Sequence, residues 1–226
     1  MNRENNKKLA IITVVHNSEI ELRFYFESII KADIKFEQLI VVDSGSDNPE
    51  YLKRYEEIKN VCIIYKSNIG FCSGNNIAYS QIREDIDYVL FLNPDIIFKK
   101  NIIPNLIQFL TGNVWAVSAL LKRYKIKNNK IILTNEIDSV GIYKTWYSRF
   151  FDSKEIRSKD PKALCGAFIL ADKRKLDDIK NEYGIFDESF FMYKEDIDLG
   201  LRALKKKYIC KIHGEKMISR DGEENQ

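Results

Sequence analysis

Tyr88-Val-Leu-Phe-Leu-Asn-Pro-Asp95 decides the fold, because an unbroken apolar run ends abruptly in a polar turn. A strand that is apolar at every position, and not only at alternate positions, is buried on both faces, as in a parallel sheet covered by helices on both sides. Leu39-Ile-Val-Val42 shows the same pattern. We therefore predict an α/β fold: a Rossmann-like αβα sandwich with a mostly parallel central sheet.

Short apolar runs alternate with amphipathic stretches outward from this strand. The first half of the chain is predicted to hold strands over 9–16, 38–43, 61–65, 88–92 and 114–120, and helices over 19–32, 49–59, 73–84 and 101–110. Beyond residue 121 the pattern changes to strand-like pieces around the turn at 127–130 and an aromatic, basic excursion over 143–157. The last part is predicted to hold strands over 164–171 and 208–212 and helices over 172–181 and 195–206. The length of 226 residues indicates one large domain, which we place at 1–213, with a C-terminal tail over 214–226 that we expect to be frayed from Arg220 onward.

Composition excludes several classes of protein. With 45% hydrophobic and 31% charged residues, the chain is neither disordered nor fibrous. Its net charge of +3 is far from that of a nucleic-acid-binding protein, so we expect no nucleic acid partner. Four scattered cysteines form no C-x-x-C pair, and the chain shows neither a signal segment nor a membrane span. We expect a cytoplasmic protein whose Lys-rich faces are either solvated or in peripheral contact with an anionic membrane.

Polar residues follow four of the predicted parallel strands, over 13–17, 43–47, 68–76 and 93–95. In an open α/β sheet, ligands bind beyond the carboxyl ends of the strands, so these segments share one rim. Asp43 can accept hydrogen bonds from a base or ribose, and turn chemistry is the alternative. Asp95 is a hard oxygen ligand for Mg²⁺ or Mn²⁺ held jointly with a diphosphate, and a simple Asn-Pro turn is the alternative.

Two glycines and two asparagines stand at a predicted helix start, over 70–76. Their backbone N–H groups can face a ligand, although a capping turn explains them equally well. No Walker loop or G-x-G-x-x-G fingerprint is present.

Glu195-Asp-Ile-Asp198 opens the helix predicted over 195–206. Acids in a first turn are stabilised by the helix dipole, which is the simplest explanation for them. The spacing along the helix assigns different roles to two of these acids. Asp198 can pair with Arg202 one turn on, whereas Asp196 is available to act as a base. We expect the apolar positions of this helix to point to the core: Ile197, Leu201 and Leu204. The aromatic segment over 186–193 can wall a pocket and raise a neighbouring carboxylate pKa by desolvation.

Taken in order, these segments resemble glycosyltransferase family 2, the inverting nucleotide-sugar transferases of GT-A fold, and within it the bacterial rhamnosyltransferase-like branch. The resemblance runs from Leu9 to Ile212. Its motifs are Thr13-Val-Val-His-Asn17, Val41-Val-Asp-Ser-Gly-Ser-Asp47, the 68–76 segment, Phe91-Leu-Asn-Pro-Asp95, Cys165-Gly-Ala-Phe168 and Gly184–Leu199 with Arg202.

The resemblance implies a site and a reaction. A nucleotide-binding half lies at about 9–121 and an acceptor half at about 122–213. A dTDP-rhamnose or UDP-hexose donor gives its sugar to a saccharide or lipid-linked saccharide, in bacterial surface polysaccharide synthesis. The implied residues are Thr13, Val15 and Asp43 at the pyrimidine base, Asn75 and Asn76 near the nucleotide, Asn93 at the ribose, Asp95 at Mn²⁺ or Mg²⁺, Gly166 where donor or acceptor approaches, and Asp196 as the base beside Glu195. His213 is the candidate histidine for the metal site.

Two other functions stay open. A nucleotidyltransferase would share the sheet and a metal carboxylate, but normally has a Gly-rich loop with basic residues after its first strand. A non-catalytic nucleotide-sugar or glycan-binding module would keep recognition and lack turnover. The Glu195-Asp196 pair favours an enzyme over such a module.

Overall fold

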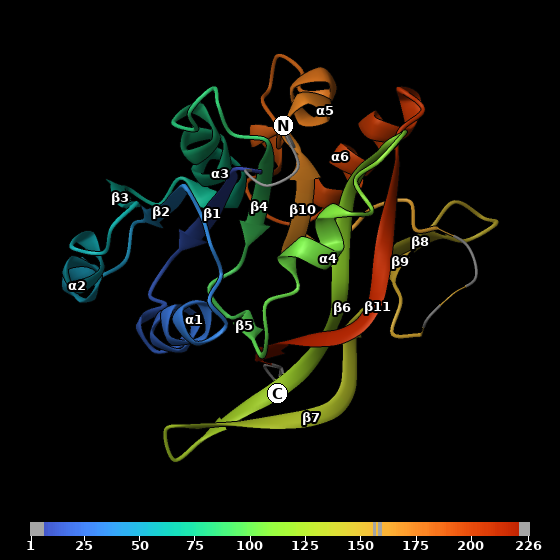
Figure 1. Cartoon of the computed structure of the whole chain (residues 1–226). Helices are drawn as coiled ribbons and strands as arrows, with labels where there is room; N and C mark the ends of the chain where they lie inside the picture. Colours follow the sequence, from blue (N-terminus) through green and yellow to red (C-terminus); the bar gives the residue numbers. More distant parts are fainter. Residues whose placement is uncertain (1–6, 156, 158–159, 222–226) are drawn as a thin grey trace, which may run out of the picture.

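The sheet at the centre of the molecule combines nine strands in the order β3-β2-β1-β4-β10-β6-β11-β5, with β7 paired to β6 (Figure 1). This computed structural model describes residues 7–155, 157 and 160–221, with residues 215–221 by their backbone. The strands of this sheet are β1 Leu9–Val15, β2 Gln38–Ser44, β3 Val61–Lys66, β4 Tyr88–Leu92, β5 Ile97–Phe98, β6 Val114–Lys127, β7 Lys130–Ser139, β10 Phe168–Asp172 and β11 Ile209–Asp221. A separate two-stranded sheet pairs β8 Ile142–Lys144 with β9 Phe150–Asp152.

The predicted mostly parallel sheet is confirmed. Strands β3, β2, β1 and β4 run parallel to one another, and β11 runs parallel to β6. Strand β10 lies between β4 and β6 and is antiparallel to both. The polar ends of the four parallel strands therefore lie on one rim, as expected from the sequence.

Helices cover both faces of this sheet. They are α1 Glu19–Lys31, the 3-10 turn η2 Pro49–Leu52, α2 Lys53–Glu56, α3 Gly70–Ser80, α4 Ile103–Ile107, α5 Lys173–Ile179, the 3-10 turn η3 Glu188–Phe190 and α6 Glu195–Lys205. Side chains of β1 alternate between the two cores: Leu9 and Ile11 pack with α1, α2 and α4, whereas Ala10 and Ile12 pack with α3, α5 and α6. This two-sided burial is what the continuous apolar strands predict.

Several element ends differ from the prediction. The helix predicted over 49–59 is the turn η2 followed by the single turn α2. Helix α3 begins three residues early, at Gly70, because the Ser44 hydroxyl accepts hydrogen bonds from the Ile69 and Gly70 amides at 3.0 and 3.1 Å. The predicted strand over 164–171 starts only at Phe168, and its first residues form the loop that carries Gly166.

The strand predicted over 208–212 continues as β11 to Asp221 and pairs with β6 and then with β5. The described part of the segment predicted as a C-terminal tail, 214–221, thus belongs to a strand that is paired with two strands far away in sequence. Residues 222–226 lie outside the described part. The turn at 127–130 is confirmed, and the strands that it joins are longer than predicted; the boundary placed between 121 and 122 falls inside β6. Of the helices that the structure describes, none combines the length and hydrophobicity needed to cross a bilayer.

Candidate functional site

The loops after β1 and β2 are joined by side-chain hydrogen bonds. The Asn17 amide hydrogen bonds to the Ser46 hydroxyl at 2.8 Å, and the Asn17 side chain both donates to the Asp47 carboxylate and accepts from the Asp47 N–H. The imidazole of His16 lies 3.0 Å from the Ser44 carbonyl oxygen. Two polar sequence motifs that are distant along the chain are thus fixed against each other at the rim.

The three residues predicted at the base lie at this rim with buried side chains. Asp43 is the parallel partner of Val15, and its carboxylate accepts a hydrogen bond from the Ser46 N–H at 3.2 Å. The Thr13 hydroxyl is hydrogen bonded to the Tyr25 hydroxyl at 2.6 Å, and Val15 belongs to the core. The contact of all three with a pyrimidine base stays a prediction.

The start of α3 is covered by the loop before α6. The Phe191 carbonyl oxygen accepts hydrogen bonds from the Phe71 and Cys72 amides at 2.9 and 3.3 Å. Amides predicted to face a ligand are therefore bonded to the chain itself, as in the capping alternative. Phe191, Tyr193 and Lys194 all have positive φ, at 40°, 72° and 70°. Residues other than glycine rarely adopt such backbone angles, and they keep them only where the surrounding structure holds the strained backbone in place.

Asn76 binds the chain segment that precedes α6. Its side-chain oxygen accepts from the Ile185 and Phe186 amides, both at 3.1 Å, and its nitrogen lies within hydrogen-bond distance of the Tyr183 and Phe186 carbonyls and the Glu188 carboxylate. Asn75 is buried and donates to the Phe71 carbonyl at 2.9 Å. The structure thus gives both side chains internal partners, and their proximity to a nucleotide stays a prediction.

The fold brings Asn93, Gly166 and Asp196 together from three distant segments. The Asn93 amide donates to the Ala167 carbonyl at 3.0 Å, and the Gly166 amide donates to the Asp196 carboxylate at 3.2 Å. A Cβ atom on Gly166 would lie 3.6 Å from a Glu195 carboxylate oxygen, which is ordinary contact. The protein itself therefore does not require glycine here, which leaves the close approach of a ligand as the reason proposed from the sequence.

The Glu195-Asp196 pair opens α6 at this point. Burial raises the pKa of Glu195 to about 7, and the Asp196 charge contributes to that rise. One oxygen of Glu195, Oε2, is buried and has no hydrogen-bond partner among the residues that the structure describes. Burial also raises the pKa of Asp196, against hydrogen bonds from the Gly166 and Ile197 amides that lower it. Carboxylates with raised pKa values are the kind of group that moves protons near neutral pH.

Asp95 is the residue to consider for a divalent cation. It is half-buried and follows β4, but the side chains that the structure describes include no cluster of three or more His, Cys, Asp and Glu residues. His213 is on β11, where its ring packs on Phe109 with centroids 4.7 Å apart, and β10 and β6 stand between β11 and β4 in the sheet. Mg²⁺ often takes one or two protein carboxylates and substrate phosphates, so Asp95 fits an ion that binds together with a diphosphate.

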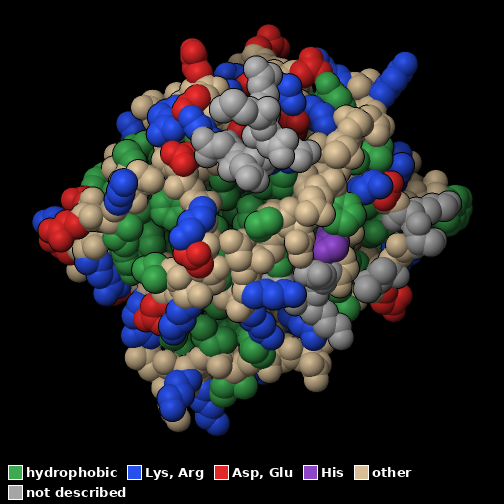
Figure 2. Space-filling model, viewed as in Figure 1, with side chains coloured by type: hydrophobic (Ala, Val, Ile, Leu, Met, Phe, Trp, Pro, Cys, Tyr) green, Lys and Arg blue, Asp and Glu red, His purple; other side chains and the backbone are tan. Residues whose placement is uncertain are grey.

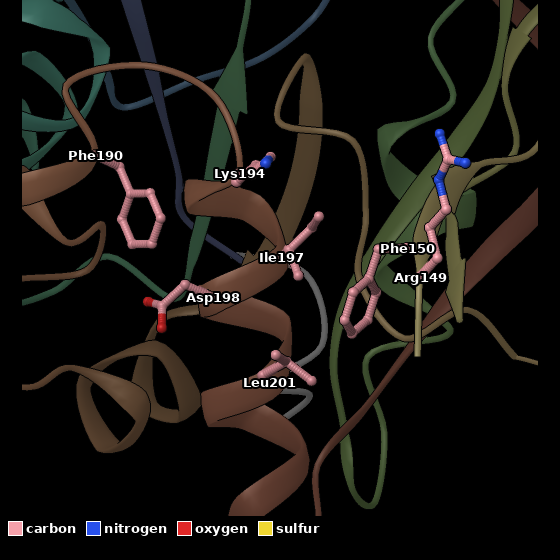
Figure 3. Close-up of a pocket in the computed structure, with 7 residues that line it drawn as sticks. All are labelled: Arg149, Phe150, Phe190, Lys194, Ile197, Asp198 and Leu201. Atoms are coloured by element: carbon pink, nitrogen blue, oxygen red, sulfur yellow. The ribbon is translucent and has the colours of Figure 1, made fainter. Parts of the chain in front are cut away.

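A cavity of about 530 Å³ lies beside α6, and its position corrects one expectation. Ile197 and Leu201 line this cavity, whereas Leu199 and Ala203 form the buried face of the helix. Figure 3 shows Ile197 and Leu201 pointing across the cavity toward Phe150. The prediction that these side chains point to the core is therefore wrong for Ile197 and Leu201, because an apolar stripe does not show whether a helix faces the core or a cavity; Leu204 is half-buried. The predicted pairing of Asp198 with Arg202 is confirmed at 2.7 Å.

Sequence reasoning missed Arg149 and Phe150, which line this cavity opposite α6. The available signal was the aromatic and basic composition of the 143–157 excursion, but nothing in that composition places it against α6. It also missed that Arg202 connects α6 to the segment before it. The Arg202 guanidinium donates to the Ile179 and Ile185 carbonyls as well as to Asp198.

The sequence model of Glycosyl transferase family 2 matches residues 10–179. Rhamnosyltransferase WbbL of Escherichia coli (strain K12) is 32% identical over 216 residues, which cover 85% of this chain and 75% of that protein. Minor teichoic acid biosynthesis protein GgaA of Bacillus subtilis (strain 168) is 27% identical over 122 residues, 51% of this chain and 27% of that protein.

Among solved structures, GalNAc-T7 with UDP, GalNAc and Mn²⁺ superimposes with a TM-score of 0.77. The match covers 97% of this chain and 44% of GalNAc-T7, at 12% sequence identity. At this identity the likeness is one of fold, and the fold is GT-A.

Proposed function

Because the chain belongs to glycosyl transferase family 2, we propose that it moves a sugar from a nucleotide diphosphate sugar to a hydroxyl of a saccharide or lipid-linked saccharide. The observation that carries this proposal is the convergence of Asn93, Gly166 and the Asp196 carboxylate at the rim of the sheet. The names of the relatives WbbL and GgaA support a role in synthesis of a bacterial surface polysaccharide.

The donor is proposed to lie across the rim, with Asp43 toward its base and Asn93 toward its ribose. A dTDP-rhamnose donor is favoured by the likeness to the rhamnosyltransferase, and UDP-hexoses are the alternatives. Asp95 would hold Mn²⁺ or Mg²⁺ together with the diphosphate, and such an ion, when bound, neutralises negative charge on the leaving group. The presence of Mn²⁺ in the GalNAc-T7 structure supports a divalent cation.

The acceptor is proposed to enter from the cavity beside α6, so that its hydroxyl reaches Asp196. Asp196 takes the proton of that hydroxyl while the oxygen attacks the anomeric carbon from the face opposite the diphosphate. One displacement of this kind inverts the anomeric configuration and needs no covalent intermediate. Hydrogen bonds from the Gly166 and Ile197 amides hold the Asp196 carboxylate in one orientation, which supports its role as the base.

Glu195 is proposed to help Asp196 indirectly. Its raised pKa, about 7, makes it partly protonated at neutral pH, which limits repulsion between the two neighbouring carboxylates. In this proposal Asp196, whose carboxylate accepts hydrogen bonds from the Gly166 and Ile197 amides, is the member of the pair that takes the proton.

The test is an incubation with dTDP-rhamnose, UDP-glucose, UDP-galactose or UDP-N-acetylglucosamine, Mn²⁺ and candidate acceptors, with free nucleotide as the readout. Asp196→Asn is expected to keep the thermal shift produced by the donor and to lose transfer by about 10²–10⁴-fold. Asp178→Asn is the matched control, because Asp178 pairs with Lys206 on the exposed surface and should transfer normally. Normal transfer by Asp196→Asn would reject the assignment, and donor binding without any turnover by the native protein would favour a binding module.

A further inference from the structure

A small hairpin projects from the side of the molecule beside the cavity. Strands β8 and β9 are joined by residues 145–149, and this connection is ordered by its own hydrogen bonds. The Thr145 amide donates to the Arg149 carbonyl at 2.8 Å, and the Ser148 amide donates to the Thr145 carbonyl at 3.1 Å. These hydrogen bonds therefore hold the two central residues of the turn in a fixed position, with their side chains directed outward.

Those central residues are Trp146 and Tyr147. Trp146 is 93% exposed, more than any other large hydrophobic side chain that the structure describes, and Tyr147 is 57% exposed. Their rings lie edge to face with centroids 5.3 Å apart. Figure 2 shows hydrophobic side chains at the right margin of the molecule, where Figure 1 places the loop between β8 and β9. Tryptophan and tyrosine together at an exposed tip are typical of groups that sit at a membrane–water interface.

The charged residues within the tip, Lys144 and Arg149, are both basic. Lys144 and Arg149 flank the two aromatic residues, and no acidic residue occurs between them. The Lys144 ammonium lies 5.8 Å from the centre of the Phe150 ring, and the Arg157 guanidinium lies 5.0 Å from the centre of the Phe151 ring. Asp152 and Glu155 are the nearest acids that follow the tip along the chain, at and beyond the far end of β9. Basic residues beside exposed aromatics match an anionic lipid surface, since each basic residue near such a surface adds attraction.

The tip continues into the cavity beside α6. Arg149 and Phe150 line one side of that cavity, and Lys194 lines the other. The residues just before Lys194, Phe191–Tyr193, are likewise exposed and apolar. Exposed aromatic groups thus lie on two chain segments that border one cavity, whose charged lining residues are the basic Arg149 and Lys194 and one acid, Asp198, which is paired with Arg202.

We propose that the hairpin tip, Lys144–Arg149, docks on an anionic lipid bilayer with Trp146 and Tyr147 inserted among the headgroups. This docking goes beyond the proposed transfer reaction and does not depend on it. It places the mouth of the cavity near the membrane surface, so that a lipid-linked acceptor reaches α6 without leaving the bilayer.

The chain offers a built-in probe for the test, because Trp146 and the buried Trp115 are its only tryptophans. Vesicles of phosphatidylcholine are compared with vesicles containing about 30% phosphatidylglycerol, by flotation and by tryptophan fluorescence, because an anionic surface should attract the basic tip. We expect binding to the anionic vesicles, a blue shift of emission, and quenching by brominated lipid. In Trp146→Phe, which leaves only Trp115, the shift and the quenching should disappear.

Trp146→Ser combined with Tyr147→Ser should weaken binding to anionic vesicles at least about 10-fold and leave the thermal midpoint unchanged, because both side chains are exposed. Tyr183→Ser, at another exposed tyrosine, and Lys127→Glu with Lys130→Glu, at the tip of the β6–β7 hairpin, are the matched controls and should bind normally. Equal binding by the double serine variant and the native protein would overturn the proposal. So would a Trp146 emission change produced by soluble saccharide or by protein concentration alone, which would assign the tip to sugar stacking or to a second copy of the chain.

Discussion

Gly184 and Asn76 form a pair whose energetic coupling follows directly from the structure. Gly184 has a φ of +104°, and a Cβ atom there would lie 2.3 Å from the Asn76 side-chain nitrogen. The Asn76 side chain also binds the backbone that follows Gly184, because its oxygen accepts from the Ile185 and Phe186 amides and its nitrogen donates to the Phe186 carbonyl. We expect Gly184→Ala to be costly for two reasons, backbone strain and collision with Asn76, and only the second reason depends on Asn76.

The magnitudes can be worked out separately. Asn76→Ala removes at most four hydrogen bonds, since an amide nitrogen has two protons and the oxygen accepts two bonds, so it should cost about 3–4 kcal/mol at about 1 kcal/mol each. Gly184→Ala should cost about 1–3 kcal/mol for the backbone and a similar amount for overpacking. In the double variant the overpacking disappears, because truncation of the Asn76 side chain leaves the space empty. The double variant should therefore be about 2 kcal/mol more stable than the sum of the single effects predicts.

Urea denaturation of the native protein, the two single variants and the double variant measures this cycle. Gly112→Ala is the control for backbone strain alone, because Gly112 has a φ of +53° and a Cβ atom placed there would meet nothing within 4 Å. Additivity of the two substitutions within about 0.5 kcal/mol would refute the coupling. A cost of Gly184→Ala no greater than that of Gly112→Ala would show that the collision is absent.

Three further predictions concern the site. Gly166→Ala should change stability little, because a Cβ there meets atoms only at 3.6 Å and beyond, and should lower transfer if donor or acceptor packs on the backbone; unchanged kcat and KM would remove Gly166 from the site. Glu195 has a pKa of about 7 in the folded chain against 4.5 in the unfolded chain, so its contribution to stability is present below pH 4.5 and is lost as the pH rises through 7. Glu195→Gln should therefore raise the free energy of unfolding by up to about 3 kcal/mol at about pH 8 and by much less at about pH 5. An equal effect of this substitution at both pH values would contradict the prediction. Mn²⁺ should stabilise the protein against heat only together with a nucleotide diphosphate, and Asp95→Asn should abolish that joint effect; stabilisation by Mn²⁺ alone would indicate a complete protein site.

The layered fold can be predicted from the sequence, because a strand that is buried on both faces is apolar at every position. Tyr88–Leu92 and Leu39–Val42 are apolar at every position, and their placement in a parallel sheet is confirmed. The antiparallel direction of β10 is not predictable in this way, because Phe168–Asp172 is buried on both faces whichever direction it takes. Direction is set by which neighbours it pairs with, and those lie far away in sequence.

The candidate site likewise combines features that the local sequence predicts with features that depend on contacts far away in sequence. The acids at 195 and 196 stand out locally, because a helix start and an apolar stripe can be recognised within one turn. The partners of Asn76 lie 107–112 residues further along the chain, so nothing near this asparagine in the sequence indicates that its side chain holds a distant turn. For the same reason the apolar stripe of α6 predicts core burial, although Ile197 and Leu201 face a cavity.

These long-range contacts explain how a buried carboxylate pair is kept in place. Charged groups that lack partners favour conformations in which they reach water, so the start of α6 needs independent restraints. Asn76 holds the 183–188 turn, the Phe71 and Cys72 amides hold the Phe191 carbonyl, and Arg202 binds the Ile179 and Ile185 carbonyls from within α6. Weakening any one of them should therefore let Glu195 gain water and lower its pKa toward the ordinary value. The pH dependence of stability should then be flatter in Asn76→Ala than in the native protein, as we also expect for Glu195→Gln, and this outcome would link the turn to the proton chemistry of the site.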